Sequence, residues 1–132
     1  MVAAPAFAIR KPAVAMFTLD DYARAGIMSA APAETLRTSV AARANILVAG
    51  GIGTIHAGTA LGALRRMEQL IQEAVVTFPR ALLAETIDLI AVLVRDGHGR
   101  RLAELARVEG LDAATGDYRL TSIPSPNPGD AP

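Results

Sequence analysis

The sequence contains no cysteine, no excess of charge of either sign and no long hydrophobic run. The absence of cysteine excludes disulfide bonds and thiolate metal sites, and it agrees with a cytoplasmic protein. Thirteen basic and thirteen acidic side chains leave no net charge, so direct binding to nucleic acid or to an anionic membrane is not expected. No apolar run approaches the roughly 20 residues that span a bilayer, so no transmembrane segment is predicted.

Side chains able to do chemistry are few and scattered. The two histidines, His56 and His98, lie far apart in the sequence, so with no thiolate present no metal site is predicted. No combination of serine, histidine and aspartate suggests a hydrolase triad. No convincing acid–base pair is expected among six carboxylates of the sequence, which are Glu34, Glu68, Glu73, Glu85, Asp88 and Glu104.

The most informative stretch is a glycine-rich turn. Residues 46–49 are apolar and partly β-branched, typical of a buried parallel strand, and they lead into Gly50, Gly51 and Gly53. Nucleotide-binding α/β domains present backbone N–H groups to a phosphate in this way. The full Walker A motif continues to a second glycine, a lysine and a hydroxyl that holds Mg²⁺. Counting from Gly50, these three positions hold Ile55, His56 and Ala57.

The 132 residues are expected to form one α/β domain. Four parts are predicted. A Pro/Ala-rich segment (1–17) with a short strand at 7–10 is followed by lead-in helices and a strand (18–50). A second half with helices and C-terminal strands (51–123) and a disordered Pro-rich tail (124–132) complete the chain. Thr18 is expected to cap a short helix that ends at Gly26. A second helix is predicted after Ser29, with Pro32 in its first turn, through about Ala42.

Residues 58–78 show the clearest periodicity. An apolar stripe with steps of three and four is formed by Leu61, Leu64, Met67, Ile71, Val75 and Phe78. The opposite side holds Arg65, Arg66, Glu68, Gln69, Gln72 and Glu73. This pattern predicts an amphipathic helix. A second helix is expected to begin at Pro79 and to turn Leu82, Leu83 and Ile87 inward.

Residues 89–94 predict a buried strand, and residues 96–99 predict a turn because they contain two glycines. Residues 100–109 have the composition of a helix by propensity, but the resemblance of the chain to a known family implies that they form the return strand of a hairpin. The turn supports the hairpin, so we expect the strand. On that strand Leu102, Glu104, Ala106 and Val108 would share one face. Residues 117–123 would add a third strand.

Two blocks of the sequence resemble a known family. Residues 51–74 resemble the histidine box and following helix of the traffic ATPases of type II and type IV secretion, above all those of the TrbB conjugal-transfer type. Residues 7–12, 17–22, 26–28 and 43–51 resemble the segment that leads into the Walker A loop of that family. The two blocks lie far apart in the family and meet here at Gly50 and Gly51. The resemblance therefore implies an internal deletion, which removes the rest of Walker A and all of Walker B, and the loss of the N-terminal domain.

The resemblance implies a remnant of a RecA-like P-loop domain with amphipathic helices and a C-terminal antiparallel hairpin. The family uses ATP and Mg²⁺, whereas weak binding or none is expected here. By resemblance, His56 is the candidate catalytic residue, and the candidate phosphate contacts are Gly50, Gly51, Gly53, Thr54 and Arg10. Family members form hexamers and work with inner-membrane secretion components, so a cytoplasmic protein, peripheral at the inner membrane through its partners, is expected.

Plainer alternatives stay open at each position. His56 can be an ordinary histidine at a strand–helix junction, and the glycines can be a by-product of the deletion. Arg10 and Lys11 can be solvated charges, and Arg65 and Arg66 a solvated face or a subunit contact. Three interpretations follow: a conjugal-transfer ATPase by ancestry, a non-catalytic remnant without function, and an interaction module that binds full-length ATPase subunits.

Overall fold

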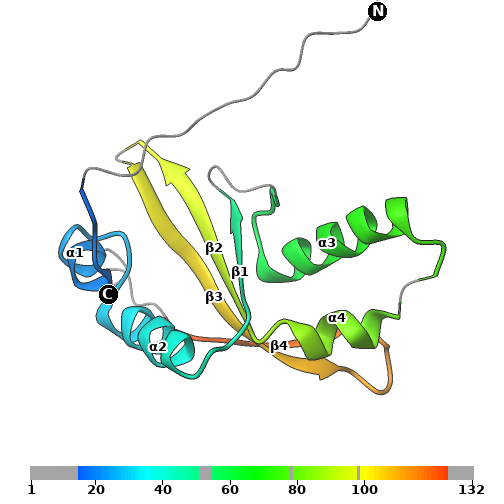
Figure 1. Cartoon of the computed structure of the whole chain (residues 1–132). Coiled ribbons are helices and arrows are strands. Elements are labelled where there is room, and N and C mark those ends of the chain that lie inside the picture. Colours follow the sequence, from blue (N-terminus) through cyan, green and yellow to red (C-terminus); the bar gives the residue numbers. More distant parts are fainter. Residues whose placement is uncertain (1–14, 51–54, 78, 98, 125–132) are drawn as a thin grey trace, which may run out of the picture.

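The structure is a computed structural model that describes residues 15–50, 55–77, 79–97 and 99–124. Within this part of the chain, four strands form one sheet with helices on both faces (Figure 1). Helices α1 (Leu19–Arg24) and α2 (Ala30–Ala41) cover one face, and α3 (Ala60–Ala74) and α4 (Arg80–Thr86) cover the other. This three-layer arrangement confirms the α/β class predicted from the sequence.

The sheet combines one parallel and two antiparallel pairings. Its order is β1 (Ile46–Gly50), β2 (Leu89–Asp96), β3 (Gly99–Leu111) and β4 (Tyr118–Ser122), so β1 and β4 form the two edges. Strand β1 runs parallel to β2, and α3 and α4 form the connection between them. Strands β2, β3 and β4 are antiparallel neighbours. The C-terminal hairpin and the third strand are therefore confirmed, including strand in place of helix over residues 100–109.

Strand β2 is the centre of the core because both of its faces are covered. Ile90 and Val92 face α3 and α4, where they pack in one cluster with Leu64 and Leu83. Leu89 and Ala91 face the α1–α2 layer, in a second cluster with Met28, Ala33, Leu102 and Leu105. Burial on both faces explains why β2 reads as a continuous apolar run rather than an alternating one.

The predicted starts of α1 and α2 are confirmed, and α3 has a cap that the sequence analysis did not predict. The hydroxyl of Thr18 accepts the N–H of Asp21 at 3.2 Å, and the Asp21 carboxylate accepts the N–H of Thr18 at 2.8 Å, which together form a capping box on α1. Helix α2 begins directly after Ser29, and the Thr59 hydroxyl caps α3. The hydroxyls of Thr18 and Thr59 each accept an N–H that the first helical turn leaves without a partner, whereas the Ser29 side chain makes no cap hydrogen bond on α2.

The predicted length of α3 was wrong, and so was the predicted burial of one side chain in α4. Helix α3 ends at Ala74, and Val75 has extended backbone and is 49% exposed rather than buried. Two consecutive β-branched residues, Val75 and Val76, favour that extended backbone. In α4, Leu83 is buried as predicted, but Leu82 is 50% exposed. Phe78 lies outside the described residues.

Two predictions about strand faces also fail. Strand β1 was expected to be buried, but it is an edge strand and its Val48 is 50% exposed. In β3 the register shifts, so that Leu102 pairs with Leu93 while Glu104 pairs with Val92. The extra residue, Ala103, turns Leu102 to the α1–α2 face and leaves Glu104 facing α3. The strand predicted at 7–10 and residues 125–132 of the tail lie outside the described residues.

Candidate functional site

The loop that follows β1 is the first candidate site, and Gly50 opens it. Gly50 has a φ of +85°, and a Cβ at this position would lie 2.0 Å from the carbonyl oxygen of Leu93 on β2. Only glycine therefore fits the close approach of β1 to β2. The N–H of Gly50 donates to the carbonyl of Ile55 at 2.8 Å and closes the loop. This amide is thus already engaged within the protein.

The N-terminus of α3 lies next to this loop and is occupied by a carboxylate of the chain itself. Oε2 of Glu104, on β3, accepts the N–H of Ala60 at 2.7 Å, and the hydroxyl of Thr59 accepts the N–H of Gly62 at 3.0 Å. A helix N-terminus attracts anions because its first N–H groups are free and its dipole is positive there. Glu104 supplies that negative charge, so a phosphate at this helix end would have to displace it.

Of the remaining predicted site residues, the structure describes His56 alone. His56 is exposed, and none of the described residues makes a hydrogen bond or an ion pair with it. Gly51, Gly53 and Thr54 lie outside the described residues, as does Arg10, so their roles as phosphate contacts stay predictions.

A second candidate site was missed by the sequence analysis, which placed Glu68 on the polar face of α3. Glu68 is only 9% exposed and accepts four hydrogen bonds. The hydroxyl of Tyr118 donates to its Oε2 at 2.9 Å. The guanidinium of Arg80 donates to both carboxylate oxygens at 2.9 to 3.2 Å and lies 5.5 Å from the centre of the Tyr118 ring. We refer to Glu68, Arg80 and Tyr118 as the Glu68 cluster.

The surroundings of Tyr118 and Arg80 in the Glu68 cluster favour the protonated form of both side chains. Burial, followed by the hydrogen bond to Glu68, raises the pKa of Tyr118 above its ordinary value, so the phenol stays protonated. The bond to Glu68 also raises the pKa of Arg80. Beside the cluster, Arg65 pairs with Asp117 at 2.6 Å, and the N–H of Tyr118 and then Arg65 lower the pKa of Asp117.

With each of its charges paired, the Glu68 cluster fits a structural joint between α3, α4 and β4 better than a reactive centre. Arg65 is exposed, as a solvated face would be, and is paired with Asp117 within the chain. The residue pattern of α3 could not have indicated the Glu68 cluster, because Glu68 lies 12 positions from Arg80 and 50 from Tyr118 in sequence. Among the described residues, no group of three or more histidines and carboxylates could hold a metal ion, and no helix is long and apolar enough to cross a membrane.

The described residues form an α/β domain in which β1 ends at Gly50 and α3 begins at Ala60, and comparison with known proteins gives its relatives. The chain is 48% identical over 61 residues to the conjugal transfer protein TrbB of Rhizobium radiobacter, covering 46% of this chain and 19% of that protein. It is 24% identical over 213 positions to the "Probable conjugal transfer protein TrbB" of Sinorhizobium fredii, covering 92% of this chain and 65% of that protein. The chain is therefore related to conjugal transfer proteins of the TrbB type.

The chain spans less than two thirds of the length of either relative. In the longer alignment, 92% of 132 residues is about 121, so about 92 of the 213 aligned positions face no residue of this chain. No protein-family profile matches the chain, and no solved structure matches it.

Proposed function

We propose that this chain is a conjugal-transfer protein of the TrbB type that no longer hydrolyses ATP. In this proposal the domain is a remnant of a RecA-like P-loop fold, in which residues 18–50 and 51–123 represent two halves separated by a deletion. The unpaired positions of the longer alignment support the deletion, and β1, its glycine turn and α3 support the P-loop ancestry.

The observation that carries the proposal is the position of Glu104. Its carboxylate bonds the first helical N–H of α3, which is where a helix after a phosphate loop would meet the anion. Phosphoryl transfer also depends on a lysine and on Mg²⁺ to stabilise the charge of the transferred group. The only lysine of the chain, Lys11, precedes the loop by 39 positions, and Ala57 stands where Walker A has a hydroxyl. ATP and Mg²⁺ are therefore expected to bind weakly or not at all.

The test is an ATPase assay on the purified chain, together with the titration of a fluorescent ATP analogue. We expect turnover at the background rate for the chain and for its His56→Ala variant. We also expect Glu104→Gln to bind the analogue more tightly than the chain does, because it removes the competing charge. Glu109→Gln, an exposed change on the same strand, is the control and should alter nothing. Turnover that is lost in His56→Ala would overturn the proposal.

A second candidate function is an interaction module that binds full-length ATPase subunits on the cytoplasmic side of the inner membrane. The outer edge of β1 favours it, because none of the described strands pairs with this edge and Val48 is exposed. The test is co-purification with a full-length TrbB protein. Binding that is lost in Val48→Lys supports the module, whereas absence of binding together with absence of turnover identifies a remnant without function.

A further inference from the structure

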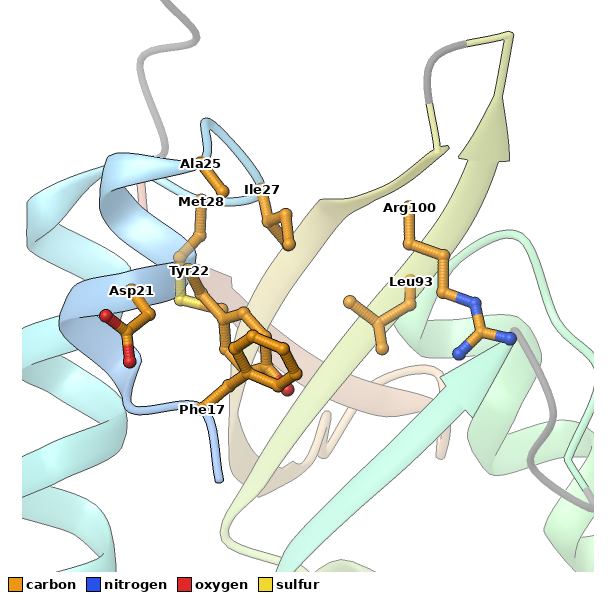
Figure 2. A pocket seen from close by; sticks show the side chains of 8 residues that line it. All are labelled: Phe17, Asp21, Tyr22, Ala25, Ile27, Met28, Leu93 and Arg100. Carbon is orange, nitrogen blue, oxygen red and sulfur yellow. The ribbon is translucent and has the colours of Figure 1, made fainter. Parts of the chain in front are cut away.

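An apolar cavity of about 540 Å³ lies between α1 and the β2–β3 hairpin, on the sheet face opposite to α3 (Figure 2). Its lining comes from both sides, with Phe17, Tyr22, Ile27 and Met28 on one side and Leu93 and Arg100 on the other. The volume lies in the range of cavities that bind small organic molecules, which are mostly apolar with a few polar groups for orientation.

The wall next to α1 is aromatic and unusually open to solvent. The rings of Phe17 and Tyr22 stack with their centres 6.2 Å apart, and Phe17 is 66% exposed. None of the described residues makes a hydrogen bond with the hydroxyl of Tyr22. Two stacked aromatic rings facing a cavity offer a large apolar contact that the described chain does not itself cover.

The wall formed by the hairpin carries two arginines with which no described residue forms an ion pair. Arg95 of β2 lies directly opposite Arg100 of β3, so the two side chains leave the same face of the sheet, which is the face of Leu93. Like charges opposite each other destabilise a strand pair. Neither arginine has a hydrogen bond or an ion pair with any described residue. Asp21 also lines the cavity, but its carboxylate is engaged by Thr18 and Arg24.

From these observations we infer that the cavity binds an amphipathic carboxylate, a small molecule with an apolar chain and one negative charge. The chain of the ligand lies between the aromatic pair and Leu93, and its carboxylate lies against Arg100 with Arg95 beside it. The anion removes the repulsion between the two arginines, and a guanidinium holds a carboxylate through two parallel hydrogen bonds. The inference is independent of the proposed function, because it concerns the opposite face of the sheet from α3.

The experiment is a titration of the full chain with decanoate, followed by two-dimensional NMR, below the concentration at which decanoate forms micelles. We expect saturable shifts at Ile27, Met28 and Leu93. Octanoate should bind about tenfold more weakly, because each buried CH₂ contributes about 0.8 kcal/mol. Decyltrimethylammonium, which has the same chain and the opposite charge, should bind at least tenfold more weakly than decanoate.

Two variants locate the site. Arg100→Gln should weaken decanoate binding by about tenfold, since it removes a charged hydrogen bond. Phe17→Ala should weaken it as well and should leave the fold intact, because Phe17 is largely exposed. Arg66→Gln, at an exposed site on α3, should have no effect.

Equal binding of decanoate and decyltrimethylammonium, or shifts confined to α3 and α4, would overturn the inference. A dimer of the free chain would also overturn it, if Phe17→Ala dissociates that dimer and decanoate does not. A second copy of the chain would then occupy the cavity.

Discussion

Replacing Tyr118 with phenylalanine tests whether the Glu68 cluster joins α3, α4 and β4. The change removes only the hydroxyl that donates to Glu68 at 2.9 Å, and the ring remains in the core. A hydrogen bond to a charged group contributes about 1.5–3 kcal/mol, so we expect the free energy of unfolding to fall by that amount. For a small domain with about 5–15 kcal/mol in total, this is a large fraction.

A second variant, Arg80→Met, keeps the apolar stem and removes the guanidinium. Glu68 then retains the hydroxyl of Tyr118 but loses its counter-charge. We expect a loss of about 3 kcal/mol, at the low end for a buried ion pair because the side chain of Arg80 is 43% exposed. The two losses should not add in the double variant, since both act through Glu68.

Urea unfolding followed by circular dichroism measures all four proteins of this cycle. Arg66→Met, on an exposed part of the same helix, should change the free energy of unfolding by no more than about 0.5 kcal/mol. If Tyr118→Phe is as mild as Arg66→Met, or if the two losses add fully, the cluster does not act as a unit and the reasoning is refuted.

The same hydroxyl predicts how stability changes at alkaline pH. Burial holds the pKa of Tyr118 in the folded chain above its value of 10.0 in the unfolded chain. Above pH 10 the unfolded chain therefore loses a proton that the folded chain keeps, and stability falls with rising pH by at most about 1.4 kcal/mol per pH unit. Below the unfolded pKa this contribution is fully present. In Tyr118→Phe the decline above pH 10 should be smaller.

Three further predictions concern the fold. Leu64→Ala should reduce the free energy of unfolding by about 2–5 kcal/mol in urea melts, since Leu64 is fully buried, whereas Leu82→Ala at a half-exposed site should not. Gly50→Ala should lower the thermal midpoint far more than Gly26→Ala, because both glycines have positive φ but only the first Cβ meets a backbone atom, and equal effects would contradict this. The N–H of Thr115 lowers the pKa of Asp112, so stability should decline as pH falls below 3.8, and Asp112→Asn should flatten that decline in acid titrations followed by fluorescence of a bound dye.

Features set by neighbouring residues were predictable from the sequence. The capping box at Thr18, the cap at Thr59 and the steps of three and four along α3 each depend on residues within one or two helical turns. The β2–β3 hairpin was predicted from the family resemblance with support from the turn glycines, although the helix propensity of residues 100–109 pointed to the wrong structure. Pairing with β2 overrode that propensity.

Features set by distant residues were not predictable. Glu68 was placed on the polar face of α3, and its partners Arg80 and Tyr118 lie 12 and 50 positions away in sequence. The bond from Ala60 of α3 to Glu104 spans 44 positions, and no local pattern indicates it. The cavity next to α1 depends on two elements more than 60 positions apart in sequence, and no local pattern marks it. Of the predicted phosphate loop, the structure describes Gly50, whereas the contacts of Gly51, Gly53 and Thr54 stay predictions.

The outer edge of β1 determines how copies of this chain would associate at high concentration. Ile46–Gly50 contains no charged side chain and no proline, which are two devices by which edge strands avoid pairing. In the part of the chain that the structure describes, no strand covers this edge. Two copies that pair β1 with β1 form a closed, two-fold symmetric dimer, in which the exposed edges cover each other. Copies that pair β1 with the opposite edge, β4, extend one continuous sheet without closing, so the choice of edge separates a soluble dimer from a filament.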